Sequence, residues 1–215
     1  MDALKETIYT EMFDHVEKQL AGYDVHGGKK RNKIRYSRMD HTRRVYRWMM
    51  QLYEANENKS QIDIESLKIA TIFHDSGYGS IEEGEHAEAG ARICRDYLSG
   101  LAYSREKIDF ICGLIASHSD KKKLQEEDIS PELMLLMEAD LLDDTGAHGV
   151  VMDIWMEATG EDVTFESIRD HIARFSVKQT QKNPMRTREG RRIWEEKSAL
   201  VKAFYEAYCR DLEWQ

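Results

Sequence analysis

Histidine and aspartate side chains that could bind a metal recur at the ends and within the apolar parts of helical patterns. His41 opens one pattern, His74-Asp75 closes the next after the apolar run IATIF, and Asp140 lies inside LMLLMEADLLDD. Taken alone, a buried histidine is more often a core residue, and Asp140 could instead pair with an arginine. Together, imidazoles and carboxylates from separate helices suit a first-row divalent metal in a helical bundle.

The doublet His74-Asp75 can serve one site only at the end of a helix. Adjacent helical residues diverge by roughly 100°, so the two side chains cannot share one stripe in the middle of a helix. The glycine-containing segment 76–79 follows at once and predicts a helix stop there. Two further histidines, His86 at the start of one helical pattern and His118 at the end of another, extend the set of possible ligands.

Helical periodicity is widespread, only two prolines interrupt it, and alternating strand patterns are almost absent. Asp63, Ser130 before Pro131, and Thr187 are typical helix starts. We expect an all-α bundle without a sheet, forming a single domain over 1–215, with its core at about 35–175 and a C-terminal helical segment 176–215 packed on it. The expected helices cover about 2–20, 38–56, 63–75, 85–99, 104–119, 130–142, 147–158, 164–175 and 187–212.

Composition excludes several functional classes for this chain of 215 residues. The net charge of -9 argues against a partner that is a nucleic-acid polymer, but it does not exclude a small phosphorylated substrate. No apolar run approaches the roughly 20 residues that span a bilayer. The first twenty residues mix charges into a helical pattern, so we expect a cytoplasmic protein that neither enters a membrane nor carries a signal peptide.

The sequence also contains three cysteines and two runs of basic residues. Cys94, Cys112 and Cys209 fit no zinc spacing and no disulfide framework, and the first two are expected to be buried small hydrophobic residues. The basic segments 27–35 and 121–123 are either solvated loops or anion-attracting rims of a pocket.

The ordered set of His41, His74-Asp75 and Asp140 resembles the HD superfamily of metal-dependent phosphohydrolases, in particular small bacterial single-domain members. The spacings are 33 residues (74 − 41) and 65 residues (140 − 75). The flanking sequences HTRRVYRWM, LKIATIFHDSGYG, EHAEAGARI, LIASHS and MEADLLDDTGAHGV also resemble the family. A similar C-terminal signature lies in FSVKQTQKNPMRTREGRRI, with Phe175, Lys178, Thr187 and Gly190.

The resemblance implies an HD-domain helical bundle that hydrolyses a phosphate ester or anhydride, often of a nucleotide. It implies one divalent ion, or two, among Mn, Fe, Mg, Co and Zn. The ligands would be His41, His74, Asp75 and Asp140. His86 and His118 match additional histidines that bind a second metal in some members and face the substrate phosphate in others; here we favour the phosphate.

Roles in catalysis follow from that assignment. Asp75 would orient the attacking water or act as general base, while His86 and His118 would donate hydrogen bonds to phosphate oxygens. The family's basic residue after the last ligand is replaced by Leu141. Arg44 and Lys178 are therefore the candidates for binding the rest of the anion, and Arg186 is a further substitute.

A homodimer is compatible with the sequence. Two other functions are also compatible with the same residues. Six ligands could hold two irons, as in HD-fold oxygenases that cleave carbon–carbon or carbon–phosphorus bonds. The missing basic residue at position 141 instead favours a non-enzymatic sensor that binds a nucleotide without turnover.

Overall fold

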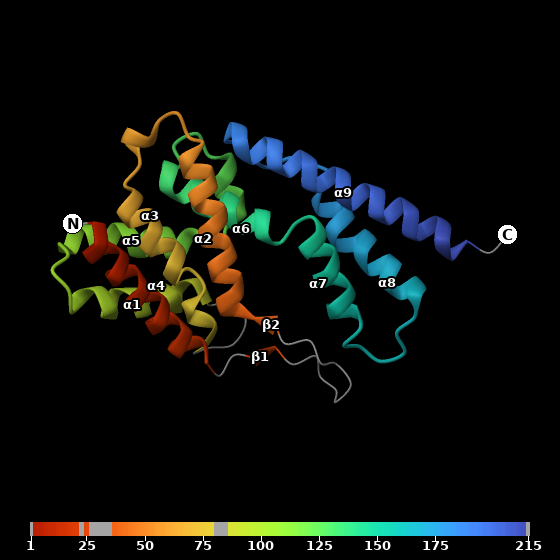
Figure 1. Ribbon diagram of the computed structural model, residues 1–215, viewed down its shortest axis with the longest axis horizontal. Helices are drawn as coiled ribbons and strands as arrows, with labels where there is room; N and C mark the ends of the chain where they lie inside the picture. The colour runs from red at the N-terminus through yellow and green to blue at the C-terminus, as the bar shows by residue number, and fades with distance from the viewer. Residues whose placement is uncertain (1, 22–23, 26–35, 80–85, 214–215) are drawn as a thin grey trace. The chain divides into compact units, whose positions relative to one another are not determined.

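The computed structural model describes residues 2–21, 24–25, 36–79 and 86–213, and it confirms the all-α class (Figure 1). The chain forms two compact units. The first comprises Met1–Asp24 and Ser37–Ala139, and the second comprises Val25–Tyr36 and Asp140–Gln215. The single-domain organisation expected from the sequence stays a prediction.

The first unit contains five complete helices, α1 to α5, among the residues described. They are α1 (Asp2–Leu20), α2 (Arg38–Glu54), α3 (Ile64–Phe73), α4 (His86–Ser99) and α5 (Arg105–Ser117), with short 3-10 turns η1 (Lys59–Gln61), η2 (Ser76–Gly79) and η3 (Lys121–Gln125). Helix α6 (Pro131–Asp143) passes from the first unit into the second between Ala139 and Asp140.

The expectation of no sheet is corrected by a minimal one. Strands β1 (Asp24–Val25) and β2 (Tyr36–Ser37) pair as a two-stranded sheet. Two residues are too few to produce the alternation that reveals a strand in a sequence, which needs about four to eight.

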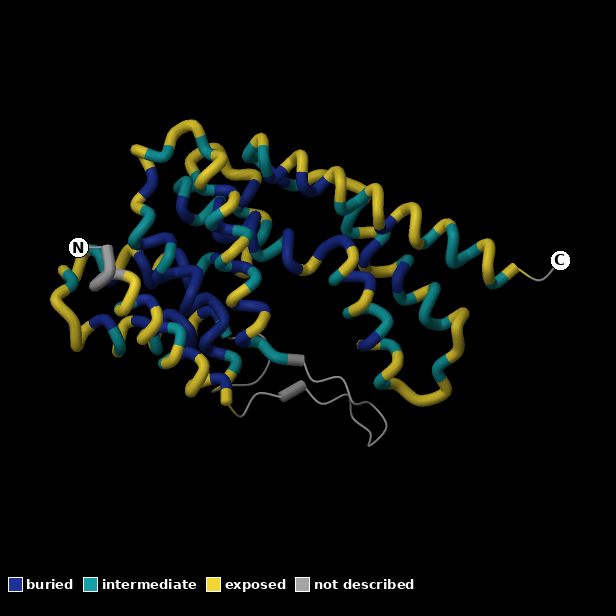
Figure 2. Tube along the Cα trace, viewed as in Figure 1, coloured by how far each residue is buried: buried dark blue, intermediate teal, exposed yellow. Residues whose placement is uncertain are grey.

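Helix α3 is the centre of the first unit. Leu67, Ile69, Ile72 and Phe73 have no exposed surface, and the helix packs against α1, α2 and α5. Most of its length is drawn in the dark blue of buried residues in Figure 2. Every residue from 69 to 73 is buried, so this end of the helix is covered on every side. The end of α3 is therefore held inside the bundle, and with it the doublet that follows.

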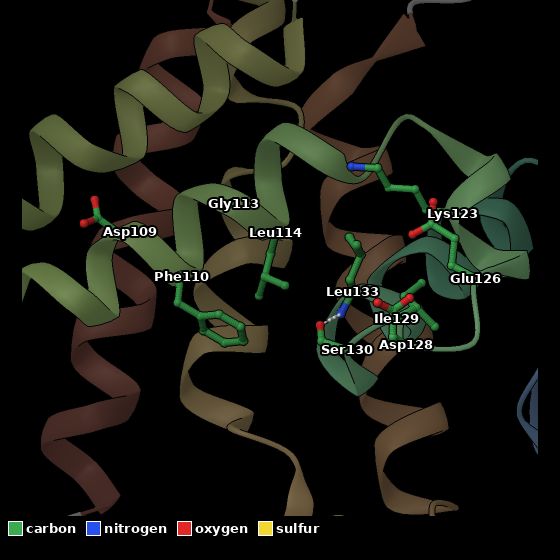
Figure 3. Close-up of a pocket in the computed structure, with 10 residues that line it drawn as sticks. All are labelled: Asp109, Phe110, Gly113, Leu114, Lys123, Glu126, Asp128, Ile129, Ser130 and Leu133. Atoms are coloured by element: carbon green, nitrogen blue, oxygen red, sulfur yellow. Dashed lines mark hydrogen bonds between the residues drawn. The ribbon is translucent and has the colours of Figure 1, made fainter.

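The predicted helix starts are confirmed. The carboxylate of Asp63 accepts a hydrogen bond from the backbone nitrogen of Ser66 at 3.1 Å, at the start of α3. The hydroxyl of Ser130 accepts one from the nitrogen of Leu133 at 3.2 Å, ahead of Pro131 in α6, which Figure 3 draws as a dashed line. Each cap satisfies one of the backbone donors that a helix leaves unpaired at its start.

The second unit contains α7 (Ala147–Glu157), α8 (Phe165–Ile172), a π-helical turn η4 (Ala173–Val177) and α9 (Arg188–Leu212). Val150, Ile172 and Val201 form its buried core. The sequence predicted ordinary helix up to residue 175, whereas the π turn inserts one extra residue per turn and carries Phe175 there. None of the helices described in either unit is both long and apolar enough to cross a membrane.

Close backbone packing holds the turn after α3 against α4. A β-carbon built on Gly77 would lie 2.0 Å from the carbonyl oxygen of His86, and one on Gly90 would lie 3.0 Å from the carbonyl oxygen of Phe73. Only glycine permits this approach, so Gly77 fixes where His86 lies relative to the end of α3.

Gly77→Ala should therefore destabilise the protein by about 1–3 kcal/mol, because backbone atoms must move to accept the methyl group. The matched control is Gly113→Ala in α5, where a β-carbon meets nothing within 4 Å. That change should stabilise the helix by about 0.5–1 kcal/mol. Urea unfolding of both variants measures the difference, and equal stability of the two would contradict the packing argument.

Candidate metal centre

The carboxylate of Asp75 lies at the middle of four imidazoles. Its Oδ2 is 3.3 Å from Nε2 of His41 and 3.5 Å from Nε2 of His74. Its Oδ1 is 3.5 Å from Nε2 of His118 and 3.6 Å from Nε2 of His86. The structure thus brings together five of the residues singled out in the sequence, with one carboxylate oxygen facing each pair of rings.

The end of α3 places this carboxylate. The helix stops at Phe73, two residues earlier than the sequence predicted, and His74 is its C-cap. The hydroxyl of Ser76 donates to the carbonyl oxygen of Phe73 at 2.8 Å and closes the turn. The regular α-helix ends here, and ligand atoms of His74 and Asp75 face the same point, as the helix-stop argument required.

Backbone carbonyls orient two of the rings. Nδ1 of His74 lies 2.8 Å from the carbonyl oxygen of Thr71, and Nδ1 of His118 lies 2.6 Å from that of Ile115. A carbonyl can only accept, so Nδ1 carries the proton in both rings and a neutral ring has its lone pair on Nε2. In the neutral state both lone pairs point at the Asp75 carboxylate, whereas a protonated Nε2 donates a hydrogen bond to it.

Such an arrangement of acceptors suits a cation. Nε2 of His74 also lies 3.4 Å from Nε2 of His41. Ligand atoms of His74, Asp75 and His118 all lie within 4.8 Å of one another. Lone pairs converging on a carboxylate repel unless a proton or a metal ion lies between them, and imidazole nitrogen with carboxylate oxygen is a donor set for zinc, manganese, iron or cobalt.

The site keeps Asp75 ionised. Burial by itself raises the pKa of this carboxyl, but the charge on His74, hydrogen bonds from His118 and His41, and the charge on Arg38 together hold the pKa well below its usual value. Only 3% of the residue is exposed. The carboxylate is therefore in the state that a metal ligand requires.

Two residues of this centre were missed in the sequence. Nη1 of Arg38 donates to Oδ2 of Asp75 at 3.1 Å. The same guanidinium lies over the ring of Tyr78, 4.1 Å from its centroid, and Tyr78 in turn stacks on His86 at 4.2 Å. Arg38 precedes His41 by three residues and so shares its helical face, which is the signal that could have revealed it.

The fourth expected ligand, Asp140, lies in α6. Three other acids of that helix, Glu132, Glu138 and Asp143, are buried. Asp140 is also the first residue of the second unit, and its part in a metal site stays a prediction.

The candidates for anion binding lie in both units. Arg44 is partly buried in α2, three residues after His41, while Lys178 is exposed directly after the π turn of the second unit. Arg186, also in the second unit, is partly buried. Their contacts with substrate stay predictions.

The basic run 121–123 and Thr187, both singled out in the sequence, have structural roles. Lys121 donates to the carbonyl oxygen of His118 at 2.8 Å, and Lys123 donates to the hydroxyl of Ser117 at 2.9 Å, so this basic run supports the end of α5. Thr187 accepts from the nitrogen of Gly190 at 3.0 Å and caps α9. The basic segment 27–35 lies outside the described residues.

A pocket of about 430 Å³ in the first unit is separate from this centre (Figure 3). Phe110, Leu114 and Leu133 supply its apolar wall. Lys123 and Glu126 also line the pocket and lie to the right in the view. No histidine lines it. We call Asp75 and the four imidazoles around it the imidazole centre. This centre, and not the pocket, therefore has the groups that hydrolytic chemistry needs.

Comparison with known proteins places the chain among relatives of the same fold. It is 18% identical to an HD-superfamily hydrolase from Bacillus thuringiensis, with a TM-score of 0.69 over 98% of this chain and 100% of that one. It is also 18% identical to YpgQ of Bacillus subtilis in a structure with ADP, with a TM-score of 0.69 over 99% of this chain and 97% of that one. At these identities the likeness shows the fold.

A curated relative is the CC-adding tRNA nucleotidyltransferase of Thermus thermophilus, 30% identical over 108 residues. That match covers 41% of this chain and 24% of the relative, so the chain spans about a quarter of that protein's length. The model of the HD domain family matches residues 38–145, which is half of the chain and includes all five residues of the imidazole centre. The chain therefore belongs to the HD domain family.

Proposed function

We propose that this protein is a metal-dependent phosphohydrolase that acts on a small phosphorylated substrate, most simply a nucleotide. The observation that carries the proposal is the buried Asp75 carboxylate, which faces two imidazoles with each oxygen. The solved relative described as an HD-superfamily hydrolase and the relative that holds ADP support the reaction class and the substrate class.

We propose His41, His74, Asp75 and Asp140 as the metal ligands. A divalent ion held there would supply a bound water of lowered pKa and would neutralise charge on a phosphoryl oxygen. Asp75 then has two functions, because one oxygen can bind the metal while the other orients the attacking water.

His86 and His118 face the other oxygen of Asp75, and we propose that they contact the substrate phosphate. The side chain of His86 is 14% exposed, whereas those of His74 and His118 are almost fully enclosed, so His86 lies on the accessible side of the centre. As imidazoliums both rings could donate to phosphoryl oxygens. The bare Nε2 of a neutral His118 equally suits a second metal, so stoichiometry is the discriminating measurement.

Arg38 supplies a positive charge that was not expected. Its guanidinium pairs with Asp75 and lies on Tyr78, so it is held close to the place where phosphate charge would develop. Together with Arg44 it could compensate for the absence of a basic residue at position 141. Lys178 is our candidate for contacts with the rest of the anion.

The activity itself is tested by a phosphatase and pyrophosphatase screen of purified protein with Mn, Mg, Co, Fe and Zn, with products identified by phosphorus NMR. We expect turnover of at least one nucleotide. Oxygen consumption with iron loading would instead favour the oxygenase, and ligand-induced thermal stabilisation without any product would favour the sensor.

His74→Ala or Asp75→Ala should abolish metal binding and activity, because each removes a ligand that no neighbour replaces. The matched control is His15→Gln in α1, a histidine whose ring packs on Tyr97 at 4.6 Å. Metal analysis after dialysis should give about one equivalent for the control and none for the site variants. Full activity in excess chelator would refute the scheme.

His118→Ala should keep the metal content of the wild type while kcat/KM falls by about 100-fold or more, as expected for loss of a charged hydrogen bond in the transition state. Loss of one whole metal equivalent would overturn the phosphate-contact assignment and raise the standing of a dinuclear site.

Arg38→Met should leave metal affinity unchanged or stronger, since the guanidinium no longer competes for Oδ2 of Asp75. Its kcat/KM should fall by at least about tenfold, because a positive charge near the phosphate is lost. Isothermal titration with Mn and steady-state kinetics separate these effects. Unchanged kinetics would show that the Arg38 pair with Asp75 is structural.

A further inference from the structure

Two cysteines lie between the same helices that carry His86 and His118. These rings meet at 5.3 Å, so the start of α4 lies beside the end of α5 and the helices run antiparallel. Cys94 follows His86 by eight residues and Cys112 precedes His118 by six. The thiols therefore lie about 9–12 Å along the helix axes from the imidazole pair.

The two thiols are in contact. Cys94 and Cys112 lie within hydrogen-bonding reach of each other. Sγ of Cys112 also donates to the carbonyl oxygen of Ala91 at 3.3 Å, one turn before Cys94 on α4. The side chain of Cys112 in α5 thus contacts the backbone of α4, so the two helices lie close together here. This arrangement exceeds the role of isolated small hydrophobic residues that the sequence suggested.

The thiol of Cys112 borders a pocket. A pocket of about 320 Å³ is lined by Cys112 together with Arg92, Arg95, Asp109 and Gly113, whereas Cys94 is completely enclosed. A small molecule in this pocket meets the sulfur of Cys112 first and reaches Cys94 only through it.

The surroundings distinguish the two sulfurs chemically as well. The hydrogen bond from Cys94 lowers the pKa of Cys112, and the positive charge of Arg95 adds to this against the effect of burial and of Asp109. Burial raises the pKa of Cys94. Cys112 is therefore the more acidic of the two sulfurs, and a thiolate is the form of cysteine that attacks an oxidant.

We propose that Cys94 and Cys112 are a peroxide-sensitive thiol pair that closes to a disulfide between α4 and α5. The Cys112 thiolate attacks one oxygen of hydrogen peroxide, the O–O bond breaks, and hydroxide leaves to become water. The sulfur of Cys94 then attacks the sulfenic acid of Cys112 and displaces a second water. Two thiols lose two electrons and two protons, and one peroxide becomes two waters.

The disulfide would connect α4 and α5, the two helices that present His86 and His118. The proposal does not depend on the identity of the metal or substrate, because the thiol pair and its pocket lie outside the imidazole centre. Its test can therefore fail while the hydrolase proposal stands, and the reverse is also true.

The experiment treats full-length, metal-free protein with hydrogen peroxide, denatures it, alkylates the remaining thiols and maps peptides by mass spectrometry. We expect a linked pair of peptides containing Cys94 and Cys112, the loss of two hydrogens from the whole protein, and an alkylated Cys209. Cys209→Ser is the matched control and should form the same bond.

Single variants test the order of events. In Cys94→Ala, Cys112 should be trapped by dimedone as a sulfenic acid, at least about tenfold faster than Cys94 is trapped in Cys112→Ala. Oxidised wild type should also unfold at a higher temperature than reduced wild type, a shift absent from both variants. The proposal is overturned if Cys94 and Cys112 remain fully alkylated while methionines oxidise, or if Cys209 is the residue that reacts.

Discussion

A negative charge in the interior of a helical bundle is the constraint on which the centre of this protein depends. Asp75 is almost completely enclosed, and an isolated carboxylate in such surroundings would be protonated or would destabilise the fold. The charges of His74 and Arg38 and hydrogen bonds from His118 and His41 compensate that charge. The same groups that make the carboxylate tolerable leave it ionised, which is the condition for binding a metal.

Backbone geometry positions many of these groups. The apolar α3 ends at Phe73, so the doublet leaves the helix inside the bundle instead of at its surface. Gly77 and Gly90 let the following turn press against α4, which brings His86 towards Asp75. Carbonyl oxygens at the ends of α3 and α5 then set the proton on Nδ1 of His74 and His118. Rings oriented in this way lose little freedom when they bind a cation.

Helices α4 and α5 serve the centre at one end and hold the thiol pair further along. Their antiparallel packing makes both pairs a property of one interface, with His86 and His118 in contact at the accessible end. Because packed helices move as rigid elements, a bond between Cys94 and Cys112 would act on the spacing of these two imidazoles without contacting them. Family membership covers residues 38–145 and hence this whole interface.

The amino-acid sequence by itself determined the helical architecture, because periodicity, caps such as Asp63 and Ser130, and the helix end near His74-Asp75 are local properties of the chain. The order of histidines and aspartates likewise indicated the family, which the comparison confirms. Local sequence patterns do not determine the contacts between segments that lie far apart in the chain.

Only the tertiary structure decided that Arg38 and Tyr78 join the centre, that each oxygen of Asp75 faces two rings, and that Cys94 touches Cys112. It also decided that Glu132, Glu138 and Asp143 are buried in α6. The physical reason is that a sequence pattern specifies which face of a helix is apolar, whereas the packing of helices decides which atoms meet across those faces.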